Sequence, residues 1–129
     1  MAAEHVAYWL DIADYDLETA EAMYQTKRWL YVAFMCHQVI EKTLKAYWCD
    51  TQPDIPPYTH NHKRLAAGCG LYDRMTDKQK SFIETVTNYN IEARYPEDKN
   101  ALAKTLTEQA CRELINETKQ MQEWIKEQL

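Results

Sequence analysis

With 129 residues, of which 46% are hydrophobic, the chain is long enough for one domain with its own core, over residues 1–129. Two glycines and four prolines are too few for a disordered chain or a turn-rich β protein, so the composition predicts an all-α fold. The formal net charge of −5 argues against a protein that coats duplex DNA through its charge alone.

Two long helices are predicted in the first part of the chain. Apolar residues recur every three or four positions over 6–24, which indicates an amphipathic helix. Residues 30–49 are apolar on most faces, which is typical of a helix in the middle of a bundle. Prolines are concentrated in residues 52–58, which are therefore predicted to form a stiff connecting loop.

Local signals predict a short third helix and a longer fourth one. Thr59 is the expected N-cap of the short helix, which ends near Gly68 and Gly70, residues suited to a left-handed terminus. Thr76 opens a capping-box motif at the start of the fourth helix. Pro96 is expected to close that element.

The last helix is expected to begin at Asp98 or Asn100 and to carry an apolar stripe over 102–125. Together these elements predict an up-and-down bundle of four long helices plus one short helix, with mainly antiparallel neighbours. The residues expected in its core are Trp9, Leu17, Phe34, Ile40, Leu44, Val86, Leu106 and Leu114.

Polar residues gather on one face of the second helix. Gln38, Glu41, Lys42 and Lys45 are spaced by three or four positions, and Glu41 precedes Lys45 by four, which favours a helix ion pair. Such a face is compatible with simple solvation, which contributes little to stability. Two lysines on a largely buried helix also fit an anion site, with Gln38 and Glu41 in support.

Histidines lie on both sides of the proline-rich loop. His60 is expected at the N-terminus of the third helix, where unpaired backbone N–H groups attract a phosphate. His60 and His62 do not share a helix face, and metal motifs on helices use spacings of three or four, so no metal site is predicted. His37, inside the apolar run, is expected to be a hydrogen-bonded core histidine.

Arg94 is the strongest candidate for a phosphate contact. Pro96 fixes the chain just beyond it, Tyr95 adds anchoring bulk, and a rigidly held arginine makes a good fork for a phosphate or carboxylate. The alternative is a structural arginine that pairs with a nearby carboxylate such as Glu92, Glu97 or Asp98.

Several chemistries lack their usual signals. The sequence has no Gly-x-Ser-x-Gly elbow and no glycine-rich phosphate loop, so most enzymes that a local motif can identify are excluded, and no cofactor is expected. The cysteines at 36, 49, 69 and 111 form no C-x-x-C pair, and we expect reduced, buried thiols in a cytoplasmic protein. No apolar run is long enough for a membrane span.

Three linked motifs resemble the HEPN family of small helical domains. They are the Gln38-to-Lys45 helix face, the Thr59-His60 pair and the Arg94-Tyr95-Pro96 turn. The resemblance implies a helical bundle that forms a homodimer and is often paired with a minimal nucleotidyltransferase. It also implies roles in nucleotide binding, RNA cleavage or toxin–antitoxin pairs.

Ribonuclease members of that family carry a histidine separated from the arginine by four to six residues, whereas the corresponding positions of this chain are Lys99, Asn100 and Ala101. Without the histidine, RNA cleavage lacks its obvious proton-transfer group, and the possible substitutes, Lys99 and Tyr95, are of residue types that ordinarily titrate far from neutrality. The prediction is therefore a domain that binds nucleotide or RNA phosphate through Lys42, Lys45, His60 and Arg94 without strong catalysis. A ribonuclease toxin that uses Arg94 and a structural adaptor are the alternatives.

Overall fold

The computed structural model describes residues 2–129, apart from the side chain of residue 93, and all regular structure in this range is helical. This confirms the predicted all-α fold. Three long helices are α1 (Ala2–Gln25), α2 (Trp29–Thr51) and α6 (Glu108–Glu127). The shorter elements are α3 (His62–Gly68), η1 (Tyr72–Arg74), α4 (Asp77–Thr87), η2 (Ile91–Ala93) and α5 (Pro96–Thr105).

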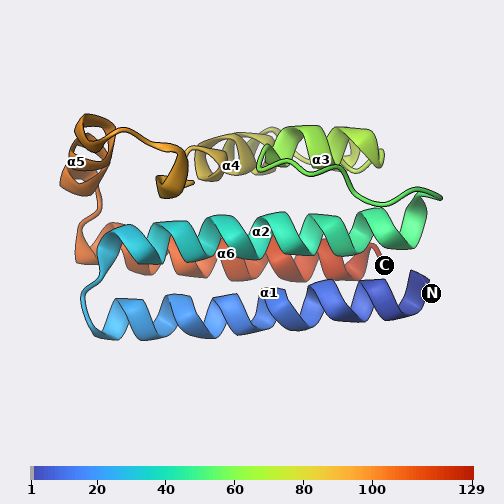
Figure 1. The fold of residues 1–129 in the computed structure, drawn as a ribbon, viewed down its shortest axis with the longest axis horizontal. Helices are drawn as coiled ribbons and strands as arrows, with labels where there is room; N and C mark the ends of the chain where they lie inside the picture. Colours follow the sequence, from blue (N-terminus) through green and yellow to red (C-terminus); the bar gives the residue numbers. More distant parts are fainter. Residues whose placement is uncertain (1) are drawn as a thin grey trace.

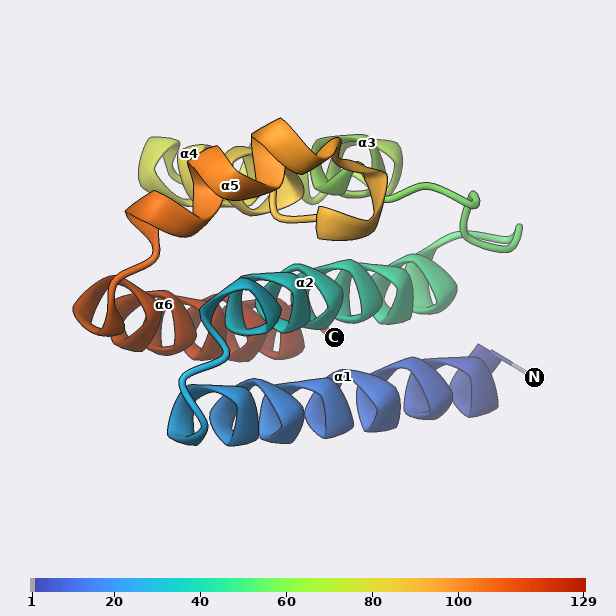
Figure 2. The same ribbon diagram turned by 60° about the vertical axis from the view of Figure 1, so that its left-hand side comes forward.

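Helix α2 lies at the centre of the molecule and packs against all five other α-helices. Figure 1 shows α1 on one side of α2, α6 alongside it, and α3 and α4 covering the opposite side. The segment from α3 to α5 runs back along the side of α2 that faces away from α1 (Figures 1 and 2). Helix α6 therefore runs in the same direction as α2, while α1 runs antiparallel to both. The central position explains why α2 is apolar on most of its faces.

The start of α3 differs from the prediction. Asn61, not Thr59, is the N-cap, because its side chain accepts a hydrogen bond from the backbone N–H of Arg64. His60 therefore lies in the loop that precedes the helix. The capping box at Thr76 is confirmed, and Gly70 has the expected left-handed φ of 78°.

The second half of the chain is divided differently from the prediction. Helix α4 ends at Thr87, and Pro96 is not a terminator but the first residue of α5, where its missing N–H costs nothing. The expected cap at Asp98 or Asn100 is also wrong, because the predicted last helix is two helices. The side chain of Thr107 accepts a hydrogen bond from the Ala110 N–H and starts α6 after a break at Leu106.

The hydrophobic core lies around α2. Of the residues predicted to be buried, Phe34, Ile40, Leu44, Val86, Leu106 and Leu114 are buried. Leu17 and Trp9 are only partly buried, because both lie on α1, which covers one side of α2. The four cysteines are buried and unpaired, as expected. Among the helices of residues 2–129, none combines the length and apolar character that crossing a membrane requires.

Candidate functional site

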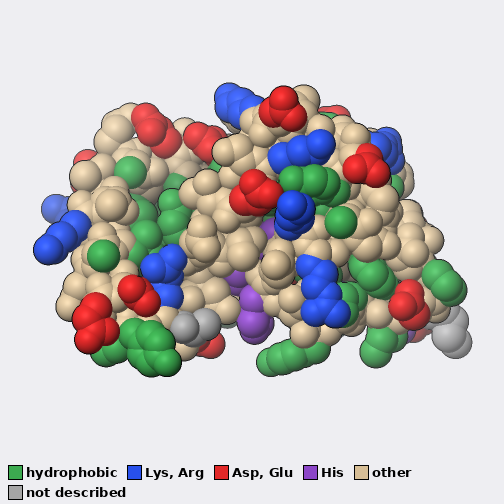
Figure 3. Space-filling view, turned by 90° about the horizontal axis from the view of Figure 1, so that it is seen from above, with side chains coloured by type: hydrophobic (Ala, Val, Ile, Leu, Met, Phe, Trp, Pro, Cys, Tyr) green, Lys and Arg blue, Asp and Glu red, His purple; other side chains and the backbone are tan. Residues whose placement is uncertain are grey.

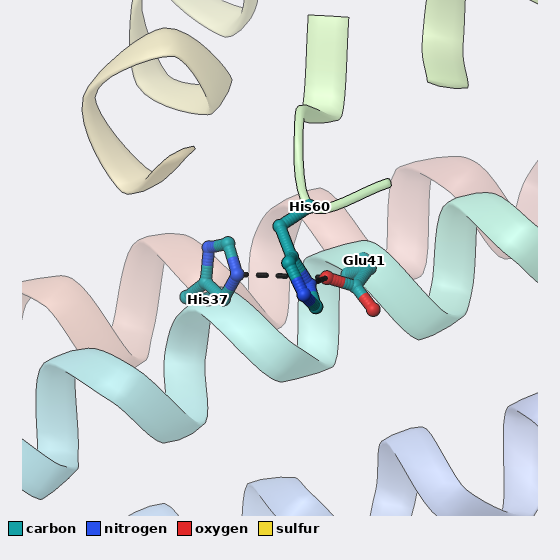
Figure 4. A group of neighbouring side chains, drawn as sticks. All are labelled: His37, Glu41 and His60. Atoms are coloured by element: carbon teal, nitrogen blue, oxygen red, sulfur yellow. Dashed lines mark hydrogen bonds and ion pairs between the residues drawn. The ribbon is translucent and has the colours of Figure 1, made fainter. Parts of the chain in front are cut away.

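A buried carboxylate in the middle of α2 organises the polar interior. Glu41 is 3% exposed. Its Oε1 lies 2.7 Å from His60 Nδ1 and 3.5 Å from His37 Nε2 (Figure 4). Its Oε2 accepts a 3.1 Å hydrogen bond from Lys45 Nζ. Burial alone would raise the pKa of Glu41, but the hydrogen bond from His60 and the ammonium of Lys45 outweigh it and lower the pKa to about 2. Glu41 is therefore ionised at neutral pH.

His37 has a fixed tautomer. Its Nδ1 lies 3.1 Å from the carbonyl oxygen of Val86, which can only accept, so Nδ1 carries the proton. In the neutral ring, Nε2 then presents a lone pair. That atom is buried and has no hydrogen-bond partner among the described residues. The expected core histidine is confirmed, but only one of its two nitrogens is satisfied.

His62 ties three helices together. Its ring nitrogens lie 3.0 Å from the carbonyl oxygen of His37 and 3.3 Å from that of Ile83. Complete burial, with the nearby His37 adding to it, lowers the pKa of His62 to about 3, so the ring is neutral and donates to one carbonyl at a time. Its place between α2 and α4 makes it a structural residue.

The loop before α3 and the segment after α4 enclose an open depression of about 630 Å³. Figure 3 shows histidine side chains in a hollow on this face, with Lys and Arg side chains on both sides. The residues that line the depression are His60, Asn61, Thr87, Asn88, Asn90, Arg94, Tyr95 and Asp98. We call it the His60–Arg94 pocket. Most of its lining groups are hydrogen-bond donors or can act as donors.

Arg94 is held by the backbone. Its Nε donates a 2.7 Å hydrogen bond to the carbonyl oxygen of Asn88, six residues earlier. Among the residues described, neither terminal nitrogen of this guanidinium has a hydrogen bond or ion pair of its own. The nearby carboxylate of Asp98 lines the same pocket without such a pairing. The arginine is thus anchored at one nitrogen, with two donor groups left for a ligand.

The structure brings only some of the predicted site residues together. His60, Arg94 and Tyr95 line one pocket. Lys45 does not line this pocket, but it is linked to His60 through Glu41, whose carboxylate accepts a hydrogen bond from each of them. Lys42 donates to Asp16 of α1 at 2.6 Å, and half-buried Gln38 is not part of the pocket lining.

Sequence reasoning missed the asparagines of the pocket and the second nitrogen of His37. Asn88 and Asn90 flank a tyrosine in a short loop, a signal that is common in ordinary turns. His37 and Glu41 have the spacing of helical ligand pairs, but the third partner, His60, is supplied by a loop nineteen residues beyond Glu41. Such a partner becomes visible only in three dimensions.

Comparison with known proteins places the chain in a family. Residues 6–128 match the family described as HEPN domain. The chain belongs to the HEPN family. The crystal structure of TT1696 from Thermus thermophilus superposes on this HEPN domain with a TM-score of 0.81 and 18% identity, over 96% of this chain and 98% of that one. This likeness establishes a shared fold. No curated protein matches the sequence.

Proposed function

We propose that this HEPN domain binds the phosphate of a nucleotide or of RNA in the His60–Arg94 pocket. The observation that carries the proposal is the arginine anchored through Nε to Asn88, with its two terminal nitrogens unpaired beside an open depression. A guanidinium with parallel N–H groups matches two phosphate oxygens, and a pre-positioned one loses little entropy on binding. His60 lines the same pocket and adds a further nitrogen.

Exposed aromatic rings beside the pocket favour a nucleotide over inorganic phosphate. Tyr95 is 75% exposed and lines the pocket, and Tyr58 is 92% exposed with its ring centroid 5.8 Å from that of His60. Unstacked bases are commonly held on such rings, and base–aromatic stacking contributes roughly 1–3 kcal/mol per base. Single-stranded RNA or a mononucleotide therefore fits the surface better than a duplex.

The local charge balance tolerates an anion although the protein is acidic overall. Lys45 forms an ion pair with the buried Glu41 carboxylate and His60 donates a hydrogen bond to it, so the negative charge is largely compensated before any ligand binds. Asp98 is the remaining acidic group of the pocket lining. Because binding depends on charge, the affinity should fall with added salt.

The test is a titration of AMP, ATP and a short single-stranded RNA against wild type and Arg94→Ala. Loss of one charged contact should weaken binding by roughly 10- to 150-fold. Lys45→Ala should have a smaller effect, because that lysine acts through Glu41. Lys104→Ala is the matched control, since it removes an exposed positive charge outside the pocket. Equal affinities of wild type and Arg94→Ala for every ligand would refute the proposal.

A second candidate function, RNA cleavage, is favoured by the pairing of His60 with Glu41. The ionised carboxylate accepts a 2.7 Å hydrogen bond from His60 Nδ1, which leaves Nε2 as a proton acceptor in the neutral ring. His60 and Arg94 line the same pocket. His60 thus offers the proton-transfer group that the sequence lacks after Arg94.

Cleavage is tested with end-labelled RNA in the presence of a chelator. An active domain should lose cleavage in both His60→Ala and Arg94→Ala and retain it in Lys104→Ala. An inactive wild type that still binds RNA would leave phosphate binding as the function. Cleavage that survives His60→Ala would remove this histidine from the reaction.

Family membership supports two further proposals, a homodimer and pairing with a minimal nucleotidyltransferase. Two apolar hollows of about 340 and 300 Å³ lie at the α1–α2 turn and share Arg28 and Tyr31. Tyr31 is 50% exposed there. Exposed aromatic groups over apolar hollows are typical of protein interfaces. We propose this surface for the partner contact, outside the His60–Arg94 pocket.

A further inference from the structure

We infer that His37, Glu41 and His60 form a binding site for a divalent transition-metal ion such as Zn²⁺. One ligand atom from each residue can be chosen so that all three lie within 4.8 Å of one another. Two imidazole nitrogens and one carboxylate oxygen are a donor set that suits such ions. The inference is independent of the proposed function, because the ion would bind without any nucleotide.

The unsatisfied nitrogen of His37 is the main argument. The Val86 carbonyl fixes the proton on Nδ1, so the lone pair of Nε2 lies 3.5 Å from the Glu41 carboxylate oxygen. Two electron-rich atoms then approach each other in a buried place, where water does not screen the repulsion. A cation between these two atoms would replace the repulsion with two coordination bonds, one to His37 Nε2 and one to the Glu41 carboxylate. Nε2 has no hydrogen-bond partner among residues 2–129.

The surroundings have the form that metal ligands require. A ligating histidine usually donates its other N–H to a carbonyl or carboxylate, and His37 does so to Val86. A ligating carboxylate is usually held by a further hydrogen bond, and Lys45 holds the other oxygen of Glu41 at 3.1 Å. His37 and Glu41 are four residues apart on one helix face, so the backbone already positions two of the three ligands.

His60 completes the site from the loop. Ligand atoms around a tetrahedral zinc ion lie about 3.4 Å apart. His60 Nδ1, now 2.7 Å from Glu41 Oε1, must therefore move slightly away from the carboxylate. Its side chain is 45% exposed and belongs to no helix, so this adjustment needs no repacking. The ring changes tautomer: the proton moves to Nε2, and Nδ1 gives its lone pair to the ion.

The fourth position of the ion would be open to the His60–Arg94 pocket, because His60 is also part of that pocket's lining. Water or a ligand oxygen would fill it. The same ion would convert His60 Nε2 from a proton acceptor into a donor. Metal binding would therefore suppress a cleavage reaction in which this nitrogen acts as the base.

The test uses the full chain, first stripped with a chelator and then titrated with Zn²⁺ and with Co²⁺ as a spectroscopic probe. We expect one ion per chain, a higher melting temperature with Zn²⁺, and visible Co²⁺ absorption of tetrahedral type without the near-ultraviolet band of a thiolate ligand. His60→Gln should weaken the affinity by roughly 10- to 100-fold or more. His5→Gln is the matched control, since His5 is exposed on α1 and outside the cluster.

His37 and Glu41 are buried, so their variants risk misfolding, and the decisive comparison rests on the loop residue His60. Glu41→Gln is a second test if its circular dichroism matches wild type. Zn²⁺ affinity that is unchanged in His60→Gln would overturn the inference. The same holds if wild type binds no ion in the micromolar range, in which case a second proton on His37 is the better account of its contact with Glu41. Either result leaves the phosphate titration unaffected.

Discussion

Lys42 Nζ donates a 2.6 Å hydrogen bond to Asp16 Oδ2, which joins α2 to α1 rather than to the His60–Arg94 pocket. Their side chains are 20% and 13% exposed, so the pair is partly shielded from water. Lys42 and Lys45 are three residues apart, but the first is engaged by α1 and the second by Glu41. The pair therefore fixes the packing of the first two helices.

Substitution of Lys42 should separate stability from binding. We expect Lys42→Met to lower the free energy of unfolding by about 1 kcal/mol, because it leaves Asp16 without its partner. Nucleotide affinity should stay within twofold of wild type. Urea unfolding and the AMP titration measure the two effects. If Lys42→Met instead lowers nucleotide affinity as much as Arg94→Ala does and leaves stability unchanged, Lys42 contributes to ligand binding.

Gly68→Ala should destabilise the protein, although the same change stabilises most helices. A methyl group at this position would lie 2.8 Å from Cη2 of Trp48 and closer still to Cζ3. The indole cannot easily withdraw, because its Nε1 donates to the carbonyl oxygen of Asp54 at 3.1 Å. We expect a loss of about 1–3 kcal/mol in urea unfolding.

The clash can be separated from other effects by removing the ring. In a Trp48→Leu background, the added methyl should cost nothing or stabilise the helix slightly. If Gly68→Ala costs the same in both backgrounds, Trp48 is not the obstacle.

Acid should destabilise the fold between about pH 4.5 and pH 2. The hydrogen bond from Arg112 lowers the pKa of Glu21 from 4.5 to about 2 despite partial burial, and Glu41 is lowered to about 2 as well. Both carboxylates hold their proton more weakly in the folded state, so their contribution is fully present above pH 4.5 and is lost as the pH falls toward 2.

Urea unfolding at pH 7 and at pH 3 measures this loss, which we expect to be about 2–3 kcal/mol after allowance for the partly exposed Glu21. Glu21→Gln removes one of the two groups and should make the decline visibly shallower. Parallel curves for wild type and Glu21→Gln would show that Arg112 does not stabilise the fold through this carboxylate.

The oligomeric state should depend on Tyr31. Light scattering at micromolar concentration should give about twice the chain mass of 15.3 kDa. Tyr31→Asp places a charge over the apolar hollows at the α1–α2 turn and should shift the protein toward the monomer. Tyr15→Asp is the control, because Tyr15 is 71% exposed and does not line either hollow. A monomeric wild type at high concentration would refute the homodimer.

Local sequence signals predicted the helix ends well where a position in the backbone strongly favours one residue type. The capping box at Thr76 and the left-handed Gly70 are examples, since both act within four residues. The prediction for Pro96 was wrong because proline is common both just after the end of a helix and at the first position of one. Which of the two applies depends on how the chain packs in three dimensions. The apolar stripe over 102–125 continues across Leu106, a buried residue between α5 and α6, so the apolar pattern gave no sign of the break before α6.

The site was less predictable than the fold because its contacts join residues that are far apart in the sequence. Glu41 and Lys45 were visible as a helix pair, and the structure contains that pair. The proximity of His60 to Glu41, and of Arg94 to His60, depends on how two loops close over α2. Lys42 has the same helix spacing as its neighbours, but only the position of Asp16 on α1 decides which way it turns.

Most residues that line the His60–Arg94 pocket lie in two connecting segments over the rigid central helix, residues 52–61 and 88–95, and helices α4 and α5 add Thr87 and Asp98. Backbone amides in such segments exchange with solvent through small local openings, whereas those of α2 require disruption of the core. A ligand that bridges His60 and Arg94 would close both segments at once. It would slow deuterium uptake in these two stretches of chain together and leave α1 and α6 unchanged. Two regions far apart in the sequence would thus report one binding event.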